Sequence, residues 1–481
     1  MPVIYQTSME IPSFAGLNQS GDGYNMSPRY ATEIENVDVL NGQFKPFQEG
    51  SVIAQKLGKP IGTLAYLNRR FGVDEDEREL LVAFSDGCVY TKVLDGSDQW
   101  QQVYSGLSTD YNSYVTYEVN VIDGEEQEAP VDVLLFTNAQ DGLHCLYGNT
   151  LTVVPVESCP YKLGVVSRSN ERIWGTCIPG SPDTLVYSRP YDPFDWSADE
   201  DNPEDGGGEV QSPSWDGDSF VALHTYGSQL LAFKRDAIWK IIGTDPGEYV
   251  IREQYGTGAV MNSSIAVSGT YVYMLGYNGI VRYDGSEAAG FQQDAVRTLF
   301  EKRVNKEYLD GACAVMRDRT YCLALPIDGS KVNNCVLEYN TREASYTLRT
   351  NIFVKAFLGV ADRVFYTSSV APGRVYEMCD NGHALPVKWV SGYQDLGIKS
   401  SAKSSFLLYF RAEAPTPFYL TIGIQTDKKL KEKLVTVKPG KAMRVAVNVT
   451  GRYFRLILTS YTIVPYRIAG GIKIDLELDP D

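Results

Sequence analysis

The chain has 481 residues, which is enough for two or three domains and at least one large hydrophobic core. A formal charge of −16 disfavours specific nucleic-acid binding, because that function requires a basic surface. No segment approaches the roughly 18 apolar residues of a membrane-spanning helix, and the opening residues lack the basic and apolar regions of a secretory signal. We therefore expect no membrane insertion and synthesis in a cytosol.

Residues 1–50 are polar, contain many small residues and predict an extended N-terminal arm. Within the arm only the segment ENVDVLNGQFKPF has the pattern of a β-hairpin, with its turn at Asn41-Gly42.

Residues 51–385 contain a repeated unit: an apolar β run, a tight turn, a second β run rich in Val and Tyr, and a polar loop. From Gly87 to Gly373 the units recur about every 48 residues, which fits four short strands in each blade of a β-propeller. The seven units are LLVAFSDGCVYTKVLD, VLLFTNAQDGLHCLYGN, RIWGTCIPGSPDTLVYSRP, QLLAFKRDAIWKIIGT, YVYMLGYNGIVRYDGS, RTYCLALPIDGSKVNNCVLEYNT and RVFYTSSVAPGRVYEMCDN.

Local turn chemistry and strand composition support this interpretation. Asp86-Gly87, Asn278-Gly279 and Asp328-Gly329 are residue pairs that adopt the positive φ angles of tight hairpins. In YVYMLGYNGIVRYDG both faces of the strand are apolar, as a strand between neighbouring blades requires. The alternatives are unrelated hairpins in a β-sandwich, or a propeller of six or eight blades. One short helix is predicted within residues 294–311, where apolar residues have helical spacing.

An irregular acidic stretch, YDPFDWSADEDNPEDGGGEVQSPSWDGD, occupies residues 191–218. Its composition predicts a mobile loop between blades.

After the repeats, residues 386–481 contain seven to eight predicted strands in about 95 residues, which is the pattern of a small β-sandwich. Positive charge is concentrated there, and it forms either a docking patch for an acidic partner or a solvated strand face. The residues concerned are Lys428, Lys429, Lys431, Lys433, Lys438, Lys441 and Arg444.

Motifs for catalysis and metal binding are scarce. The eight cysteines include no CxxC pair and several lie in predicted strands, so we expect reduced core thiols rather than disulfides or zinc ligands. The histidines are only His144, His224 and His383, and HExxH, GxSxG and nucleotide-binding glycine motifs are absent. We therefore predict that the chain is not an enzyme and has no catalytic, cofactor-binding or metal site.

Carboxylates beside aromatic rings leave a glycosidase as an alternative, because glycoside hydrolysis uses paired carboxyl groups. The candidates are Asp192, Asp195, Asp216 and Asp218, beside Tyr191, Trp196 and Trp215. All lie in the acidic stretch, whereas catalysis requires carboxylates held in fixed positions.

Three stretches resemble one family, the tail nozzle or tail hub proteins of bacteriophages, also called packaged-DNA stabilisation proteins. They are FAGLN followed by ATEIENVDVLNGQFKPFQEG; ERIWGTCIPGSPDTLVYSRPYDPFDW with GSQLLAFKRDAIWKIIG and YVYMLGYNGIVRYDG; and VKWVSGYQDLGIKSSAKSSFLLYFRAE with GRYFRLIL. The resemblance covers most of the chain, and it carries over no catalytic residues.

The resemblance implies a homo-oligomeric ring in the virion tail, assembled in the host cytoplasm, which retains viral DNA and later lets it pass without specific binding. It also implies portal or adaptor proteins and tail fibres or spikes as partners, contacted by the arm and the sandwich. An acidic loop would discourage DNA from adhering to such a channel, and the candidate lining residues are Asp199, Glu200, Asp201, Glu204, Asp205 and Glu209. The rival hypothesis is a carbohydrate-binding propeller, either lectin-like or receptor-binding, with Trp196 and Trp215 in surface pockets.

Overall fold

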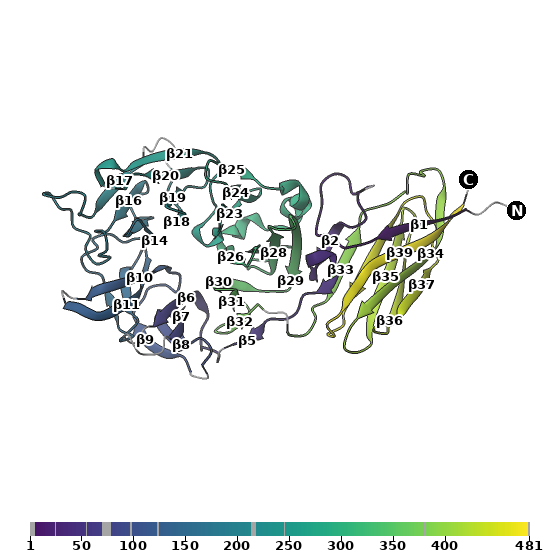
Figure 1. Ribbon diagram of the computed structural model, residues 1–481, viewed down its shortest axis with the longest axis horizontal. Helices are drawn as coiled ribbons and strands as arrows, with labels where there is room; N and C mark the ends of the chain where they lie inside the picture. Colours follow the sequence, from purple (N-terminus) through teal and green to yellow (C-terminus); the bar gives the residue numbers. More distant parts are fainter. Residues whose placement is uncertain are drawn as a thin grey trace.

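The computed structural model describes residues 5–479 except 25, 54, 70–77, 97–98, 123–124, 213–217, 245 and 379–380. Within these residues the protein is all-β: a β-propeller and a β-sandwich lie side by side along the long axis (Figure 1). Across the same residues, no helix combines the length and the apolar character needed to cross a membrane.

The propeller has seven blades of four strands each among the described residues, which confirms the predicted fold and the preferred number of blades. The outer strands of blades 4 and 5 also pair with each other in parallel, at residues 255–256 and 287–288, so these two blades form one eight-stranded sheet. The first four blades are β6 (Ile61–Arg69), β7 (Arg78–Ser85), β8 (Cys88–Val93) and β9 (Gln101–Ser105); β10 (Ser113–Ile122), β11 (Glu125–Asn138), β12 (Gly142–Tyr147) and β13 (Val153–Pro155); β14 (Val165–Ser169), β15 (Arg172–Thr176), β16 (Thr184–Tyr187) and β17 (Gly208–Gln211); and β18 (Ala222–Tyr226), β19 (Gln229–Phe233), β20 (Ile238–Ile242) and β21 (Val250–Gly256).

The remaining blades are β22 (Ala266–Ser268), β23 (Tyr271–Gly276), β24 (Gly279–Tyr283) and β25 (Glu287–Gly290); β26 (Cys313–Arg317), β27 (Thr320–Leu325), β28 (Cys335–Asn340) and β29 (Ser345–Thr350); and β30 (Val354–Val360), β31 (Arg363–Ser368), β32 (Val375–Glu377) and β5 (Ser51–Val52). The outermost strand of blade 7 thus comes from the N-terminal side of the propeller. This pairing of β5 with β32 closes the wheel through backbone hydrogen bonds.

Each blade is apolar on both faces because its neighbours cover it from either side. Between blades 2 and 3, for example, the packed side chains include Val133, Leu135, Cys145, Ile173 and Val186, all of which are buried. Such burial stabilises by about 25 cal/mol for each Å² of apolar surface removed from water. The two-sided apolar pattern seen in the sequence therefore reflects the packing between blades.

Of the three predicted tight turns, Asp86-Gly87 and Asp328-Gly329 have positive φ at both residues, whereas at Asn278-Gly279 only Gly279 does, because the hairpin there turns at residues 277–278. Asp86 and Gly87 have φ angles of 55° and 69°, and a Cβ on Gly87 would lie 2.5 Å from the Leu107 carbonyl oxygen, so glycine is required there. Asn41-Gly42 lies within η1 (Leu40–Gly42), between β3 (Val37–Asp38) and β4 (Lys45–Pro46), which pair as a hairpin.

The short helix predicted within residues 294–311 is present but ends earlier than the segment does. Residues 293–303 form one continuous helical stretch that begins as the 3₁₀ helix η4 (Gln293–Val296) and ends as the π-helix η5 (Leu299–Arg303), and the 3₁₀ helix η6 (Lys306–Gly311) follows separately. The break occurs because Val304 is extended, with ψ 127°, and forms a β-bridge with Ile327. The helical spacing of the apolar residues correctly indicated which side chains face the core, since Val296, Leu299 and Phe300 are buried. Two further 3₁₀ turns, η2 (Pro246–Glu248) and η3 (Asn262–Ser264), lie in blades 4 and 5.

The sandwich contains two sheets. One has the order β1 (Tyr5–Ile11), β39 (Arg467–Asp479), β34 (Ala402–Glu413), β37 (Ala442–Val447), and the other β2 (Ala31–Glu35), β33 (Val387–Ser391), β38 (Phe454–Ser460), β35 (Phe418–Thr426), β36 (Leu430–Val437). Residues 1–50, which the sequence predicts as an extended arm, are thus divided between the two domains: β1 and β2 belong to the sandwich and Phe47 packs at the propeller. The two ends of the chain lie together at the tip of the sandwich (Figure 1).

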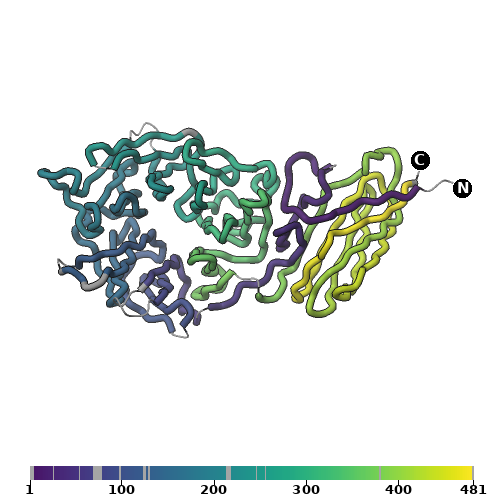
Figure 2. Tube along the Cα trace, viewed as in Figure 1, coloured from purple at the N-terminus to yellow at the C-terminus, as the bar shows by residue number. Residues whose placement is uncertain are grey.

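The N-terminal segment also joins the two domains, as its path from the sandwich to the propeller shows (Figure 2). The Leu17 amide donates to the Tyr346 carbonyl at 2.7 Å, so the segment contacts β29 of blade 6. Asn36, in the left-handed region at φ 58°, donates its amide N–H to the Leu348 carbonyl, accepts from the Thr350 amide at 2.8 Å and donates its side-chain amide to the Pro386 carbonyl at 2.8 Å. One hydrophobic core runs through this joint from blades 5 and 6 into the sandwich.

Candidate functional site at the rim of blade 3

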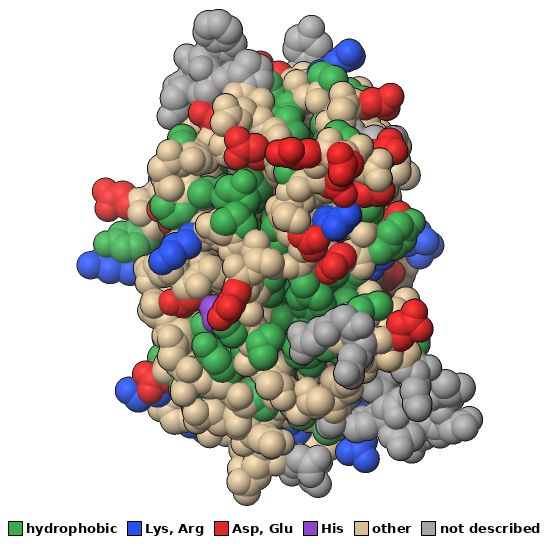
Figure 3. All heavy atoms as spheres, turned by 90° about the vertical axis from the view of Figure 1, so that its left-hand side faces the viewer, with side chains coloured by type: hydrophobic (Ala, Val, Ile, Leu, Met, Phe, Trp, Pro, Cys, Tyr) green, Lys and Arg blue, Asp and Glu red, His purple; other side chains and the backbone are tan. Residues whose placement is uncertain are grey.

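Most of the acidic stretch, residues 191–207, connects β16 to β17 within blade 3, at the end of the propeller farthest from the sandwich (Figure 1). Asp and Glu side chains gather on this end of the molecule, with apolar side chains between them (Figure 3). The prediction of a loop between blades is therefore wrong for these residues, which form a loop between two strands of the same blade, called the acidic loop below. Residues 208–211 are β17 itself, and the sequence that follows leads to β18 of blade 4.

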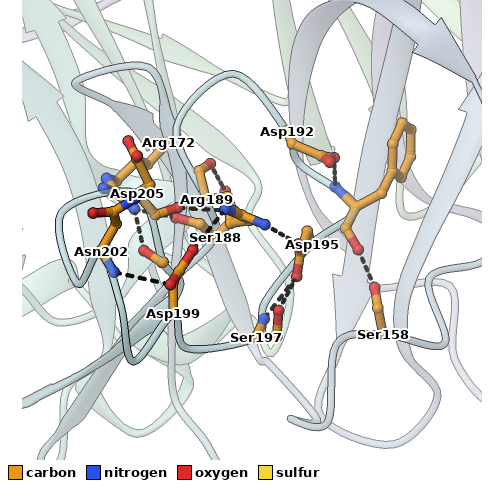
Figure 4. A network of polar contacts seen from close by, with 12 residues as sticks. Ser158, Arg172, Ser188, Arg189, Asp192, Asp195, Ser197, Asp199, Asn202 and Asp205 are labelled. Carbon is orange, nitrogen blue, oxygen red and sulfur yellow. Dashed lines mark hydrogen bonds and ion pairs between the residues drawn. The ribbon is translucent and has the colours of Figure 1, made fainter. Parts of the chain in front are cut away.

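Two arginines anchor this acidic loop (Figure 4). Arg172, only 2% exposed, donates from Nη1 to the carbonyl oxygens of Ser188 at 2.7 Å and Gly206 at 2.6 Å, and from Nη2 to that of Glu204. Arg189 forms ion pairs with Asp195 at 3.0 Å and Asp199 at 3.2 Å. Charge-assisted bonds of this kind are about twice as strong as neutral ones, so the middle of the loop is held in place rather than unattached.

The buried side chain of Trp196 supports the same loop. Trp196 is 4% exposed and donates Nε1–H to the Pro193 carbonyl at 3.0 Å. A Cβ on Gly207 would approach the Trp196 backbone to 2.7 Å, so glycine permits the close packing of the loop. Trp196 is therefore part of the core and is unavailable as the exposed stacking surface that the sequence interpretation assigned to it.

The predicted lining residues are spread over this loop. Asp199 forms an ion pair with Arg189. The backbone carbonyl of Asp205 accepts from Arg189, and that of Glu204 accepts from Arg172. Glu200 and Asp201 are exposed, and Glu209 lies on β17. None of them lines the cavity on the propeller axis. Their assignment to a channel in an assembly stays a prediction.

Each described carboxylate that was considered for glycoside hydrolysis accepts hydrogen bonds from its own neighbours in the chain fold. Burial raises the pKa of Asp195, but hydrogen bonds from Ser197 and Arg189 outweigh it and the pKa lies below its ordinary value. Asp192 Oδ1 accepts from the Phe194 amide at 2.9 Å, and Asp218 accepts from the Ser219 and Arg235 amides. Trp215 and Asp216 lie outside the described residues.

A cavity of about 610 Å³ lies on the propeller axis, lined by residues of the first strand of six blades and, next to blade 5, by residues 261–265 at η3. Its polar lining includes His224, Asn262, Asp310 and Lys355. Burial lowers the pKa of His224 to about 4, so the imidazole is neutral at pH 7. Asp310 is the one carboxylate among the described residues that line this cavity, whereas the usual glycosidase arrangement needs two.

A larger groove, about 840 Å³, lies between blades 2 and 3 and adjoins the acidic loop. Its walls contain valines and prolines together with four aromatic side chains, Tyr117, Tyr147, Tyr191 and Phe194, and the charged residues Glu118, Glu157, Arg168 and Asp192. Sequence reasoning singled out Tyr191 and Asp192 but not the blade 2 wall. The only local signal there was a run of alternating Tyr and Val, which equally well describes a core strand.

The remaining sequence candidates are dispersed. His144 is buried on β12 and stacks on Phe136 at 5.4 Å, while His383 is exposed beyond β32. Seven cysteines of the described chain are free thiols, and Cys379 lies outside the described residues. In the part of the chain that the structure describes, no group of three or more His, Cys, Asp or Glu side chains is placed to hold a metal ion.

No protein-family model matches the chain, and no curated protein matches it. Solved structures with a similar fold include the Pan2 WD40 domain of Neurospora crassa, at 10% identity and TM-score 0.36, covering 66% of this chain and 89% of that one. They also include an exo-β-1,3-galactanase of Phanerochaete chrysosporium, at 9% identity and TM-score 0.28, covering 90% and 100%. A glycoside hydrolase family 43 arabinoxylan arabinofuranohydrolase of Bacillus subtilis matches at 11% identity and TM-score 0.26, covering 90% and 99%.

Two of these three neighbours are glycoside hydrolases, so the prediction that the chain is not an enzyme is wrong as it stands, and we withdraw it. At this identity and these TM-scores the likeness carries no argument about a reaction or a substrate. The class of protein that is shown is the β-propeller with an attached β-sandwich.

Proposed function

We propose that this chain is a structural subunit of a bacteriophage tail nozzle or hub, forming a homo-oligomeric ring that retains and then releases genomic DNA. In this role it contacts portal or adaptor proteins on one side and fibres or spikes on the other, and it resides in the virion tail. The family resemblance of three stretches of the sequence is the starting point for this proposal, and the rigidity of the molecule supports it.

The observation that carries the proposal is the continuous core between propeller and sandwich. The Phe14 ring packs edge-on against Trp389 at 5.3 Å, and the same core includes Leu17, Ile34 and Tyr346. A domain pair joined only by a flexible linker bends easily, whereas a shared core and the hydrogen bonds of Asn36 resist bending. A subunit that must hold pressurised DNA in a ring requires such stiffness.

Charge is divided unequally between the domains, which also supports the proposal. Residues 51–385 contain 46 Asp and Glu against 27 Lys and Arg. Residues 1–50 and 386–481, which supply the strands of the sandwich, together contain 17 Lys and Arg against 14 Asp and Glu. An acidic propeller repels DNA phosphates within about 10 Å in physiological salt, so DNA can slide past it without adhering. The net negative charge of the chain is therefore concentrated in the propeller, while the sandwich side is close to neutral.

Mass spectrometry of virions encoded by the same genome tests the role directly, and cryo-electron microscopy of those virions locates the subunit. We expect the full-length chain in a ring of the tail. Its absence from purified virions, or a genome without portal and terminase genes beside this one, would contradict the proposal.

A further inference from the structure

The groove between blades 2 and 3 has two opposed walls of defined composition. Tyr117 and Glu118 on β10 form part of one wall, and Tyr191, Asp192 and Phe194 of the acidic loop form part of the other. Tyr191 is 68% exposed, so much of its side chain is accessible to a ligand. The volume of the groove, about 840 Å³, lies within the range of pockets that hold small molecules.

One backbone carbonyl oxygen accepts a hydrogen bond from each of the two walls. The Glu171 carbonyl oxygen accepts from the Tyr117 hydroxyl at 2.8 Å and from the Tyr191 amide at 2.9 Å. It belongs to the tight turn between β14 and β15, where Asn170 and Glu171 both have positive φ angles, 47° and 65°. The turn therefore fixes the spacing of the two aromatic walls before any ligand arrives, which lowers the entropic cost of binding.

Tyr191 itself is held in an unfavourable backbone conformation. Its φ is 62°, in the left-handed region that costs a non-glycine residue about 1 kcal/mol or more. The strained residue lines the groove with its side chain largely exposed, and its hydroxyl is hydrogen-bonded to the Glu171 side chain. The buried Trp196 supports the same loop.

The charged groups that line the groove are three carboxylates and one cation, and Asn120 and Ser158 are its neutral polar residues. Glu118, Glu157 and Asp192 line the groove, and the Arg168 guanidinium lies 4.6 Å from the centre of the Tyr117 ring. The Asp192 carboxylate is fixed at the rim by the Phe194 amide, and the Phe194 carbonyl accepts from the Ser158 hydroxyl (Figure 4). The groove therefore combines aromatic rings with hydrogen-bond acceptors that suit hydroxyl groups.

From this geometry we infer that the groove binds a neutral oligosaccharide. The C–H faces of sugar rings pack on Tyr191 and Phe194, and sugar hydroxyls donate to the carboxylates. Three carboxylates against one guanidinium disfavour sialylated or sulfated sugars and nucleic acid, because like charges in a groove repel. This site is independent of the proposed ring, since all its residues come from one chain.

A glycan array probed with the full-length chain tests the inference, with neutral, amino, sialylated and sulfated oligosaccharides on the same array. We expect neutral glycans to bind, and their sialylated counterparts to bind about tenfold more weakly. For the best glycan, calorimetry should show about tenfold weaker binding for Tyr191→Ala and retained binding for Tyr191→Phe, which keeps the ring.

Tyr461→Ala is the matched control, because Tyr461 is 82% exposed on the sandwich, outside the groove, and its loss should leave binding unchanged. The inference is overturned if no neutral glycan binds, if Tyr191→Ala binds as the parent does while remaining folded by circular dichroism, or if the chain binds basic or proline-rich peptides through this groove instead.

Discussion

Removing the charge of Glu338 should destabilise the propeller far more than removing an exposed charge. Glu338 on β28 is 3% exposed and accepts hydrogen bonds from Arg349, which is 1% exposed, and from Arg317 at 3.2 Å. The Arg349 guanidinium also lies 3.6 Å from the centre of the Phe47 ring, in the segment that passes from the sandwich to the propeller. The ion pair therefore sits where rigidity between the domains originates.

The size of the effect follows from the burial of both partners. Glu338→Gln leaves the Arg349 guanidinium charged without its carboxylate in the interior, and breaking a buried pair in this way costs about 3–5 kcal/mol. If the propeller unfolds as one unit, its unfolding entropy converts this loss into a fall in Tm of about 4–7 °C. Replacing both partners, as Glu338→Leu with Arg349→Met, should recover much of the loss because no unpaired charge stays buried.

Differential scanning calorimetry of the full-length variants measures the change. Glu413→Gln is the matched control, because its partner Arg467 lies 2.5 Å away but the two side chains are 54% and 47% exposed. Exposed pairs contribute at most about 1 kcal/mol, so this control should lower Tm by about 1 °C. Equal falls in Tm for Glu338→Gln and Glu413→Gln would refute the reasoning.

Three other predictions concern pH, packing and the N-terminus. Burial holds the folded-state pKa of His224 at about 4, below the 6.5 of an exposed histidine. As the pH falls, the unfolded chain therefore gains a proton first, and the free energy of unfolding should fall by up to about 3 kcal/mol between pH 6.5 and 4. The urea midpoint of His224→Gln should fall less over that range, and an equal fall would contradict the assignment. Gly258→Ala should lower Tm by several degrees, since its Cβ would meet the Lys234 carbonyl oxygen at 1.8 Å, whereas Gly247→Ala, which has open space, should leave Tm unchanged. Deletion of residues 1–35 should expose the core of the sandwich and cause dye-detected unfolding or aggregation, because β1 and β2 lie in its two sheets; a truncated chain with an intact Tm would show that these strands are dispensable.

The sequence by itself determined the features that depend on neighbouring residues. Asp86-Gly87 and Asn41-Gly42 specify tight turns because their backbones adopt positive φ at little cost, and the turns fall where they were predicted. Strands apolar on both faces require cover from both sides, and the even spacing of such hairpins leaves a closed wheel of blades as the arrangement that provides it.

Only the tertiary structure decided which distant segments pair. The Thr32 hydroxyl meets the Val390 carbonyl 358 residues further along the chain, and no local pattern marks β2 as a strand of the sandwich rather than part of an arm. The acidic loop depends in the same way on Arg172, whose role is invisible until the chain brings it beneath residues 188–206. The same holds for the exposed aromatic ring, which the sequence interpretation expected to be Trp196 and which is Tyr191 in the structure. Composition shows that aromatic residues are present, but the folded chain decides which of them are covered.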